Sequence, residues 1–309
     1  LYNFRVTAVN RGGESFPTEV LSAYCAPGAR KTVLVVNGFH RLSSPEVIDN
    51  DTQQGFDLDT DPGVTAGLST GWNGRQINFN KSAIGIEGPD GLGYCGNELA
   101  GRFFMGNEFN YVRTHADAIS AASGYNVASC SSEAVETGVI DLKAYDCVDL
   151  LLGLEKNDGH SLVYYKTFTP TMQSKLSAYT AGGGRLLVSG AYIGQDMKDD
   201  SERRFLSKVL HLDYAASNTT QAENISGLGM NFDIYRVPCK QHYAATSADV
   251  LSPQSPAFCV MQYADGVSAA VAYDGTDYKC FSMGFPFECI KSQQQRRLIM
   301  KGILSFLMK

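Results

Sequence analysis

The stretch AGGGRLLVSGAYIGQDM, residues 181–197, contains the junction that decides the fold. Its glycines close a predicted helix, RLLVSG is typical of a buried strand, and the chain then turns. In an α/β enzyme such a turn can present a nucleophile, because small residues around it leave the reactive side chain accessible. Ser189 stands at this position, although Leu187 replaces the leading glycine of the usual G-x-S-x-G pattern. The stretch therefore predicts an α/β fold with Ser189 as a candidate nucleophile.

Alternating strands and helices surround this junction. Apolar runs predict buried strands, and apolar stripes at helical spacing predict helices between them. Short strands follow from about residue 225, with a last amphipathic helix after them. This order favours a mainly parallel, helix-flanked sheet with an antiparallel extension. The predicted strands lie at 32–37, 125–130, 147–154, 185–190, 232–237, 257–263, 268–274 and 278–285, and the helices at 107–123, 131–135, 169–184, 201–212 and 292–309.

The first 27 residues form a separate unit in this interpretation. Residues 2–24 alternate apolar and polar positions on either side of the turn NRGGES, which predicts a hairpin. Residues 28–309 then form the α/β domain, with an irregular insertion at about 38–106. The Tyr-x-Phe-x-Val-x-Ala-x-Asn pattern, followed by Gly-x-Ser and a proline, resembles the last two strands of a fibronectin type III domain. That resemblance implies that the rest of such a domain lies upstream.

The α/β part is similar to the class I glutamine amidotransferase-like fold, a flavodoxin-like three-layer sandwich. The likeness lies in a helix, GGG, an apolar strand and SGA, followed by antiparallel strands, GFPFE and a final helix. Enzymes of that family carry a cysteine at the elbow and a His-x-Glu pair after a late strand. Here Ser189 and Gly190 occupy the elbow, and Glu288 matches the family glutamate but no histidine precedes it. Hydrolysis of glutamine by the usual triad is therefore not expected.

A serine triad remains an alternative. Ser189 would need a histidine within hydrogen-bond reach as its base. His40 follows the first strand, His160 follows the third, and His115 lies on a helix beside its apolar stripe. Asp196 is a candidate for the acidic partner, although the run DMKDDSE is also typical of a helix start, where acidic residues favour the dipole.

The insertion carries candidate ligand-binding residues. Trp72 and Tyr94 lie among Asn, Gln and Arg residues, a mixture that suits a sugar-binding surface, and the alternative is a small core that pins a long loop. Arg41 and Tyr192, at the junctions after the first and fourth strands, are further candidates. Alternate aspartates in GFDLDTDPG resemble a calcium loop, but Leu68 stands where an EF-hand needs glutamate, so a polar turn is favoured. These aspartates are Asp57, Asp59 and Asp61.

Composition limits the partners. The net charge of -6 comes without a basic run, so nucleic acid is not an expected partner. No apolar run reaches the roughly 20 residues of a spanning helix, and no glycine-rich segment carries the Lys and Ser/Thr of a phosphate loop, so neither a membrane span nor a cofactor is expected. Eight cysteines without metal-ligand spacing leave disulfides and buried thiols open.

Three functional hypotheses follow. The domain combination is similar to that of secreted Bacteroidetes proteins labelled xanthan lyase or cell-wall amidase, which implies an extracytoplasmic location and a glycan or cell-envelope ligand. The first hypothesis is a non-catalytic or diverged amidotransferase-like module of such a protein. The second is a secreted serine hydrolase that uses Ser189, and the third is a glycan-binding module built on the insertion.

Overall fold

A computed structural model describes the chain except residues 8, 12, 15–17, 40–45, 50, 58–69, 74–75, 78–94, 97–101, 106–109, 157–165 and 238–241. Only the backbone is described for the strand residues 13–14, 46–49, 54–57, 70–73, 76–77, 95–96 and 102–105. No described helix is long and apolar enough to cross a membrane.

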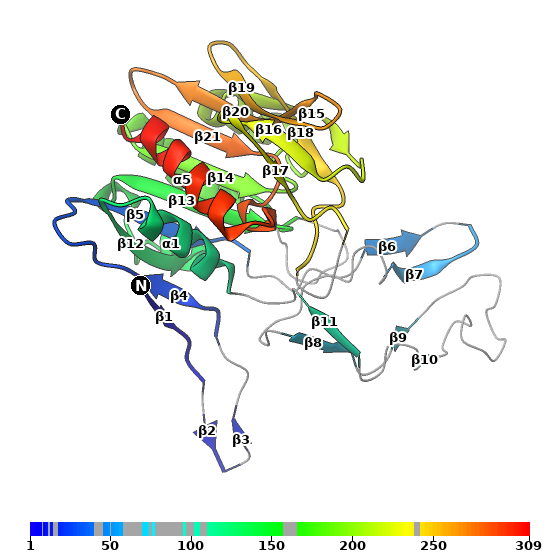
Figure 1. The fold of residues 1–309 in the computed structure, drawn as a ribbon. Coiled ribbons are helices and arrows are strands. Elements are labelled where there is room, and N and C mark those ends of the chain that lie inside the picture. Colours follow the sequence, from blue (N-terminus) through cyan, green and yellow to red (C-terminus); the bar gives the residue numbers. More distant parts are fainter. Residues whose placement is uncertain are drawn as a thin grey trace.

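A nine-stranded mixed sheet forms the centre of the molecule (Figure 1). Five neighbouring strands are parallel, and four more continue the sheet in antiparallel pairs from the fifth. The predicted α/β class and antiparallel extension are therefore confirmed. In spatial order the strands are β12 (Tyr125–Ser131), β5 (Lys31–Asn37), β13 (Cys147–Gly153), β14 (Arg185–Gly190), β21 (Lys279–Met283), β20 (Ser268–Asp274), β19 (Phe258–Tyr263), β16 (Asn224–Gly227) and β17 (Met230–Asp233).

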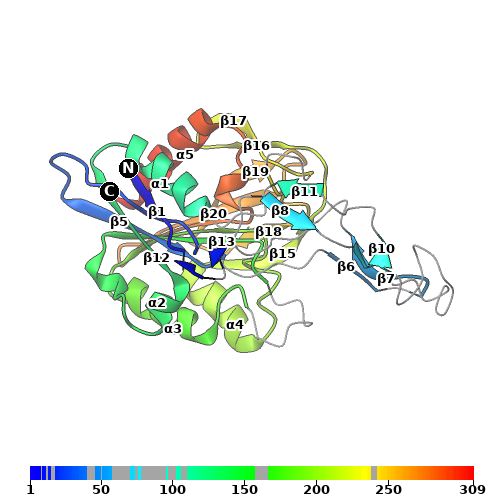
Figure 2. The ribbon, with the colours of Figure 1, turned by 90° about the horizontal axis from the view of Figure 1, so that it is seen from below.

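Helices cover both faces of the sheet, as Figure 2 shows. Two helices lie on one face over a core that includes Val33, Leu151 and Ile303, and the others lie on the opposite face over Leu34, Val148 and Leu176. Parallel strands that are buried on both faces need apolar residues on both, and β5, β13 and β14 are accordingly rich in consecutive apolar residues. The first face carries α1 (Tyr111–Ala121) and α5 (Gln293–Leu307), and the second carries α2 (Ser132–Glu136), α3 (Pro170–Ala181), α4 (Asp200–Phe205) and the π-helical turn Leu206–Leu210.

Three predicted elements differ from the structure. The strand expected at 232–237 ends at Asp233 and begins earlier, at Met230. The helix expected to reach residue 212 ends at Leu210, because His211 adopts a left-handed conformation with φ of 53° and the chain continues as a strand. That strand, β15 (Leu212–Asn218), pairs with β18 (Ala248–Pro253), which the sequence also did not predict. Within 38–106, expected to be irregular, the backbone forms three two-stranded ribbons: β6 (Glu46–Asp49) with β7 (Gln54–Asp57), β8 (Thr70–Asn73) with β11 (Arg102–Met105), and β9 (Gln76–Ile77) with β10 (Cys95–Gly96).

The N-terminal residues pair as a ribbon and contact the edge of the sheet. Strand β1 (Tyr2–Phe4) pairs antiparallel with β4 (Leu21–Ala23), and β2 (Val9–Asn10) pairs with β3 (Gly13–Glu14) further along the ribbon. Tyr24 forms an isolated bridge to Val127 of β12, and the backbone N–H of Ser22 donates to the hydroxyl of Ser129. The ribbon is therefore fixed to the outer parallel strand.

Gly153 lets the ends of β5 and β13 pack closely. It has a φ of +49°, and a Cβ built there would lie 2.1 Å from Cδ1 of Phe39. Phe39 is confined in turn by Tyr111 and Tyr243, whose ring centroids lie 6.1 and 5.6 Å away. The ring therefore cannot move aside without disturbing the core.

Replacing Gly153 by alanine tests this packing. Gly153→Ala should lose about 1–2 kcal/mol for a left-handed non-glycine residue and about 1–3 kcal/mol more for the clash with Phe39. Urea denaturation measures the loss. Gly124→Ala is the matched control, because Gly124 has a φ of +81° and no atom within 4 Å of its Cβ position. Equal losses in the two variants would contradict the close packing.

Candidate functional site

The elbow serine lies at the end of β14, inside the protein. Ser189 has no exposed surface, and its Oγ has no hydrogen-bond partner among the described residues. The following residue has to be glycine, because a Cβ on Gly190 would lie 2.8 Å from Cβ of Leu152. The predicted tight turn is thus present, but Ser189 is not bonded to any described histidine.

The turn after the elbow is held by a buried carboxylate from β18. Oδ2 of Asp249 accepts hydrogen bonds from the backbone N–H of Gly194 at 2.6 Å and of Gln195 at 3.1 Å, while its Oδ1 has no partner among the described residues. Burial raises the pKa of Asp249 to about 8, against the opposing effect of the two N–H donors. Nothing in the sequence around Asp249 indicated this role, because its partners lie 54 and 55 residues away.

His115 lies at the centre of a buried charge cluster on the α1 side of the sheet. Its Nδ1 lies 2.7 Å from Oδ2 of Asp149, at the middle of β13, and its Nε2 lies 3.2 Å from Oε2 of Glu288. Glu288 belongs to the short 3-10 turn η4 (Phe287–Cys289) after β21. The three side chains are at most 1% exposed. Two of the predicted residues, His115 and Glu288, are therefore brought together, and Asp149 joins them.

The two neighbouring carboxylates determine the protonation state of His115. Burial acts to lower the pKa of His115, but the Asp149 charge and the hydrogen bonds to both carboxylates outweigh it and raise the pKa to about 9. Burial likewise acts to raise the pKa of Glu288, and the bond to His115 outweighs it, so that this pKa is lowered. His115 is thus an imidazolium at neutral pH. Because both ring nitrogens donate to carboxylates, it cannot accept a proton from a serine.

Aromatic residues surround the cluster. The hydroxyl of Tyr243 donates to Oε1 of Glu288 at 2.6 Å, and the Tyr243 ring packs edge-on against Tyr111 and Phe39. The Phe287 ring packs against the His115 ring with centroids 4.8 Å apart. Tyr243 was not identified from the sequence. The apolar run CVDLLLGL did contain a signal, because the lone Asp149 in a strand buried on both faces requires a partner.

Asp196 belongs to a different buried group. Its Oδ2 accepts from the backbone N–H of Thr167 at 2.9 Å, and its Oδ1 lies 3.7 Å from Nζ of Lys166. Lys166 also pairs with Glu202 at 3.0 Å, and Glu202 accepts from the backbone N–H groups of Lys198 and Asp199. The predicted helix start after Asp196 is therefore confirmed, and Asp196 itself supports the loop rather than orienting His115.

The other predicted site residues are placed as follows. Tyr192 is buried, with Nζ of Lys156 lying 4.4 Å from its ring centroid. Asp57 lies on β7 and Trp72 on β8, where only the backbone is described. The residues that lie outside the described part of the chain are His40, Arg41, Asp59, Asp61, Tyr94 and His160.

Neither a metal site nor a disulfide is found in the described residues. No group of three His, Cys, Asp or Glu side chains there could hold a metal ion. The cysteines whose side chains the structure describes are free thiols. Burial raises the pKa of Cys130 and Cys280 to about 12 and that of Cys289 well above its ordinary value, so these thiols are unreactive.

Comparison with known proteins does not identify a family. No protein-family model and no curated protein matches the sequence. The structural matches include a GH42 β-galactosidase (12% identity, 63% of this chain, 25% of that chain, TM-score 0.42). They also include an exo-β-1,4-mannosidase from Opitutaceae bacterium strain TAV5 (11% identity, 65% and 32%, TM-score 0.42). A cytoplasmic protein from Salmonella typhimurium LT2 matches at 10% identity (89% and 96%, TM-score 0.42).

These likenesses assign neither fold nor function. All three TM-scores lie below 0.5, and the chain spans about a quarter of the length of the β-galactosidase. None of the three proteins is named as an amidotransferase or a xanthan lyase.

The His115 cluster predicts a loss of stability in alkaline solution. With a pKa of about 9 in the folded state and 6.5 as its ordinary value, His115 contributes stability that is fully present below pH 6.5 and is lost as the pH rises through 9. The expected fall is roughly 3 kcal/mol. Urea denaturation at several pH values measures it. The triple variant His115→Gln, Asp149→Asn, Glu288→Gln should lack the part of this fall that comes from His115. If its unfolding free energy falls with pH as steeply as that of the parent protein, the fall does not come from His115.

Asp249 predicts a separate pH effect. The pKa of Asp249 is about 8 in the folded state, against an ordinary value of 3.8. The contribution of Asp249 to the free energy of unfolding is therefore fully present below pH 4 and is lost as the pH rises through 8. Asp249→Asn should therefore be similar to the parent protein near pH 4 and progressively more stable than it up to pH 8, by on the order of 5 kcal/mol at most. Thermal and urea unfolding compare the two proteins. If the difference in unfolding free energy between the two proteins stays constant from pH 4 to pH 8, Asp249 does not have the raised pKa.

Proposed function

We propose that this chain is a non-catalytic, amidotransferase-like module of a secreted protein that handles polysaccharide or the cell envelope. One observation carries the non-catalytic part. Ser189 is fully buried without a hydrogen-bond partner among the described residues, and both nitrogens of the buried His115 bind carboxylates. A serine nucleophile needs a neutral base beside it and a substrate in contact with it, and neither condition is met by the described residues.

The order of the parallel strands supports the finer fold in this proposal. Numbered along the chain, β5, β12, β13, β14 and β21 are the first to fifth parallel strands, and they lie in the order 2-1-3-4-5. Doubly wound sheets of the flavodoxin-like type have this order, with the ligand crevice beyond the carboxyl ends of the first and third strands. Here Phe39 follows the first of these strands, and its ring packs on Tyr111 and Tyr243 in that region.

The secreted setting comes from sequence resemblance. The N-terminal ribbon pairs Tyr2 with Ala23 and Phe4 with Leu21, an antiparallel pairing of the kind that the end of a fibronectin type III domain requires. Tyr2 and Phe4 are more than half exposed on this ribbon. An exposed apolar strand face of this kind supports a packing partner such as the remainder of that domain. Glycan binding through Trp72 and Tyr94 stays a prediction from the sequence.

A fluorophosphonate probe tests the proposal. The purified protein should not be labelled under conditions that label a known serine hydrolase. Ser189→Ala should be as stable as the parent protein or up to about 1 kcal/mol more stable, because it removes a buried hydroxyl that makes no hydrogen bond. Urea denaturation provides the measurement.

Ser22→Ala is the matched control. Ser22 is also buried, but its hydroxyl donates to Oδ1 of Asn3 at 2.7 Å, so its replacement should cost about 1 kcal/mol. Labelling that disappears in Ser189→Ala would establish the serine hydrolase instead and overturn the proposal.

A further inference from the structure

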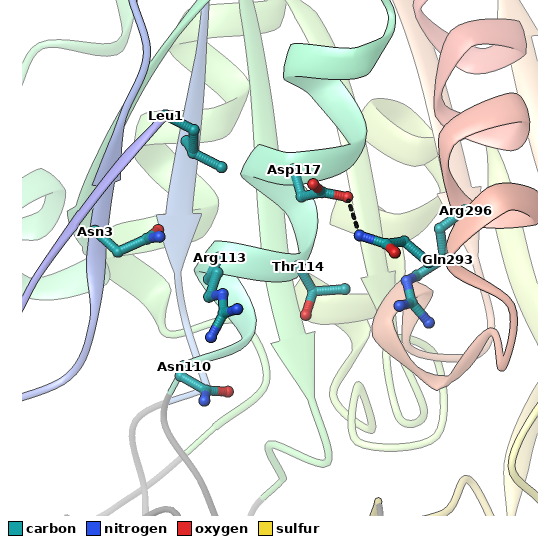
Figure 3. Close-up of a pocket in the computed structure, with 8 residues that line it drawn as sticks. All are labelled: Leu1, Asn3, Asn110, Arg113, Thr114, Asp117, Gln293 and Arg296. Atoms are coloured by element: carbon teal, nitrogen blue, oxygen red, sulfur yellow. Dashed lines mark hydrogen bonds between the residues drawn. The ribbon is translucent and has the colours of Figure 1, made fainter.

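A polar pocket opens between two helix N-termini and the N-terminal ribbon, away from the buried cluster (Figure 3). Its volume is about 340 Å³, at the lower end of the range for small-molecule sites. The first turns of α1 and α5 form two of its walls, and β1 forms the third. The lining residues are Leu1, Asn3, Asn110, Arg113, Thr114, Asp117, Gln293 and Arg296.

Two arginines give this pocket excess positive charge. Arg113 is exposed and has no ion-pair partner among the described residues. Arg296 donates through Nη1 to the backbone carbonyls of Ile290 and Lys291, which leaves its charge without a carboxylate partner there. Figure 3 shows Thr114 between the two side chains, with both guanidinium groups turned toward the N-terminal end of α1.

The one acidic residue of the lining is already neutralised. Both oxygens of Asp117 accept from Arg297, at 2.8 and 3.0 Å, and Gln293 donates to the same carboxylate at 3.1 Å. Bidentate pairing of this kind is the strongest form of a surface ion pair. Asp117 therefore does not cancel the charge of Arg113 or Arg296.

The helix dipoles add to this positive charge. The N-terminus of a helix carries a partial positive charge and normally attracts acidic residues. Neither α1 nor α5 has an acidic residue in its first turn, and Asn110 makes no side-chain capping bond at the start of α1. Arginines at these two positions are locally unfavourable, and such conflicts are typical of functional sites.

We propose that this pocket binds the oxyanion group, a carboxylate or a phosphate, of a small hydroxylated molecule. The guanidinium groups of Arg113 and Arg296 pair with the anion, and the amide and hydroxyl groups of Asn3, Asn110 and Thr114 bind hydroxyl groups beside it. A bound anion removes the electrostatic conflict between the arginines and the two helix dipoles. The inference does not depend on the proposed function, because it uses neither Ser189 nor His115.

Isothermal titration calorimetry with the 309-residue chain tests this site. Glucuronate and inorganic phosphate are the anionic probes, and glucose is the neutral probe, all at low ionic strength. At least one anion should bind, glucose should not, and added NaCl should weaken the binding. Binding of phosphate alone supports a phosphate ligand, and binding of glucuronate alone supports a sugar acid.

Variants decide whether the heat comes from this pocket. Arg113→Gln should weaken anion binding about tenfold or more, and Thr114→Val should weaken it less. Arg203→Gln, an equal change of charge at an exposed arginine of α4, should leave binding unchanged. No binding of either anion, equal binding of glucose, or full affinity in Arg113→Gln would overturn the proposal.

Discussion

The ion cluster of His115, Asp149 and Glu288 is the interaction on which the arrangement of the protein depends. A lone charge at this depth would cost several kcal/mol, and removing one member of a buried pair leaves that cost uncompensated. The members come from α1, the centre of β13 and the turn after β21, and the histidine is separated by 34 and 173 residues from its partners. The pair of His115 and Asp149 forms only when α1 lies against β13, and Glu288 joins it from the turn after β21, so the cluster holds α1 against the sheet.

The same cluster limits the chemistry available at the elbow. Asp149 pairs with Leu187 and Leu151 pairs with Ser189, so Asp149 and Ser189 project from the same face of the sheet. A histidine on that face is what a serine hydrolase would need. Here the imidazolium is held between two carboxylates, and Ser189 is left without a base among the described residues. The layout resembles a catalytic centre, but the proton that a base would have to accept is already present on His115.

The contrast between local and distant interactions explains how much the sequence predicted. Apolar runs and helical stripes predicted β13, β14 and α1 because these signals lie within each element. The strand at Leu212–Asn218 was missed because its residues are mostly exposed and directly follow a helix. His115 and Glu288 were each named as candidates, but their contact was not predicted, since it spans 173 residues. Tyr243 and Asp249 carry no local signal, because only tertiary packing gives them their roles.

Helix α1 connects the buried cluster to the surface pocket. His115 faces the sheet, while Arg113, two residues earlier, faces outward, as residues at this spacing lie on different sides of a helix. Because the inward charges hold α1 in one position, the outward arginine starts from a fixed backbone. A fixed backbone reduces the ordering cost of binding, since less freedom is lost when a ligand arrives. His115, Asp149 and Glu288 pair with one another inside the protein, whereas α1 and α5 present Arg113 and Arg296 at the surface pocket, where a ligand can reach them.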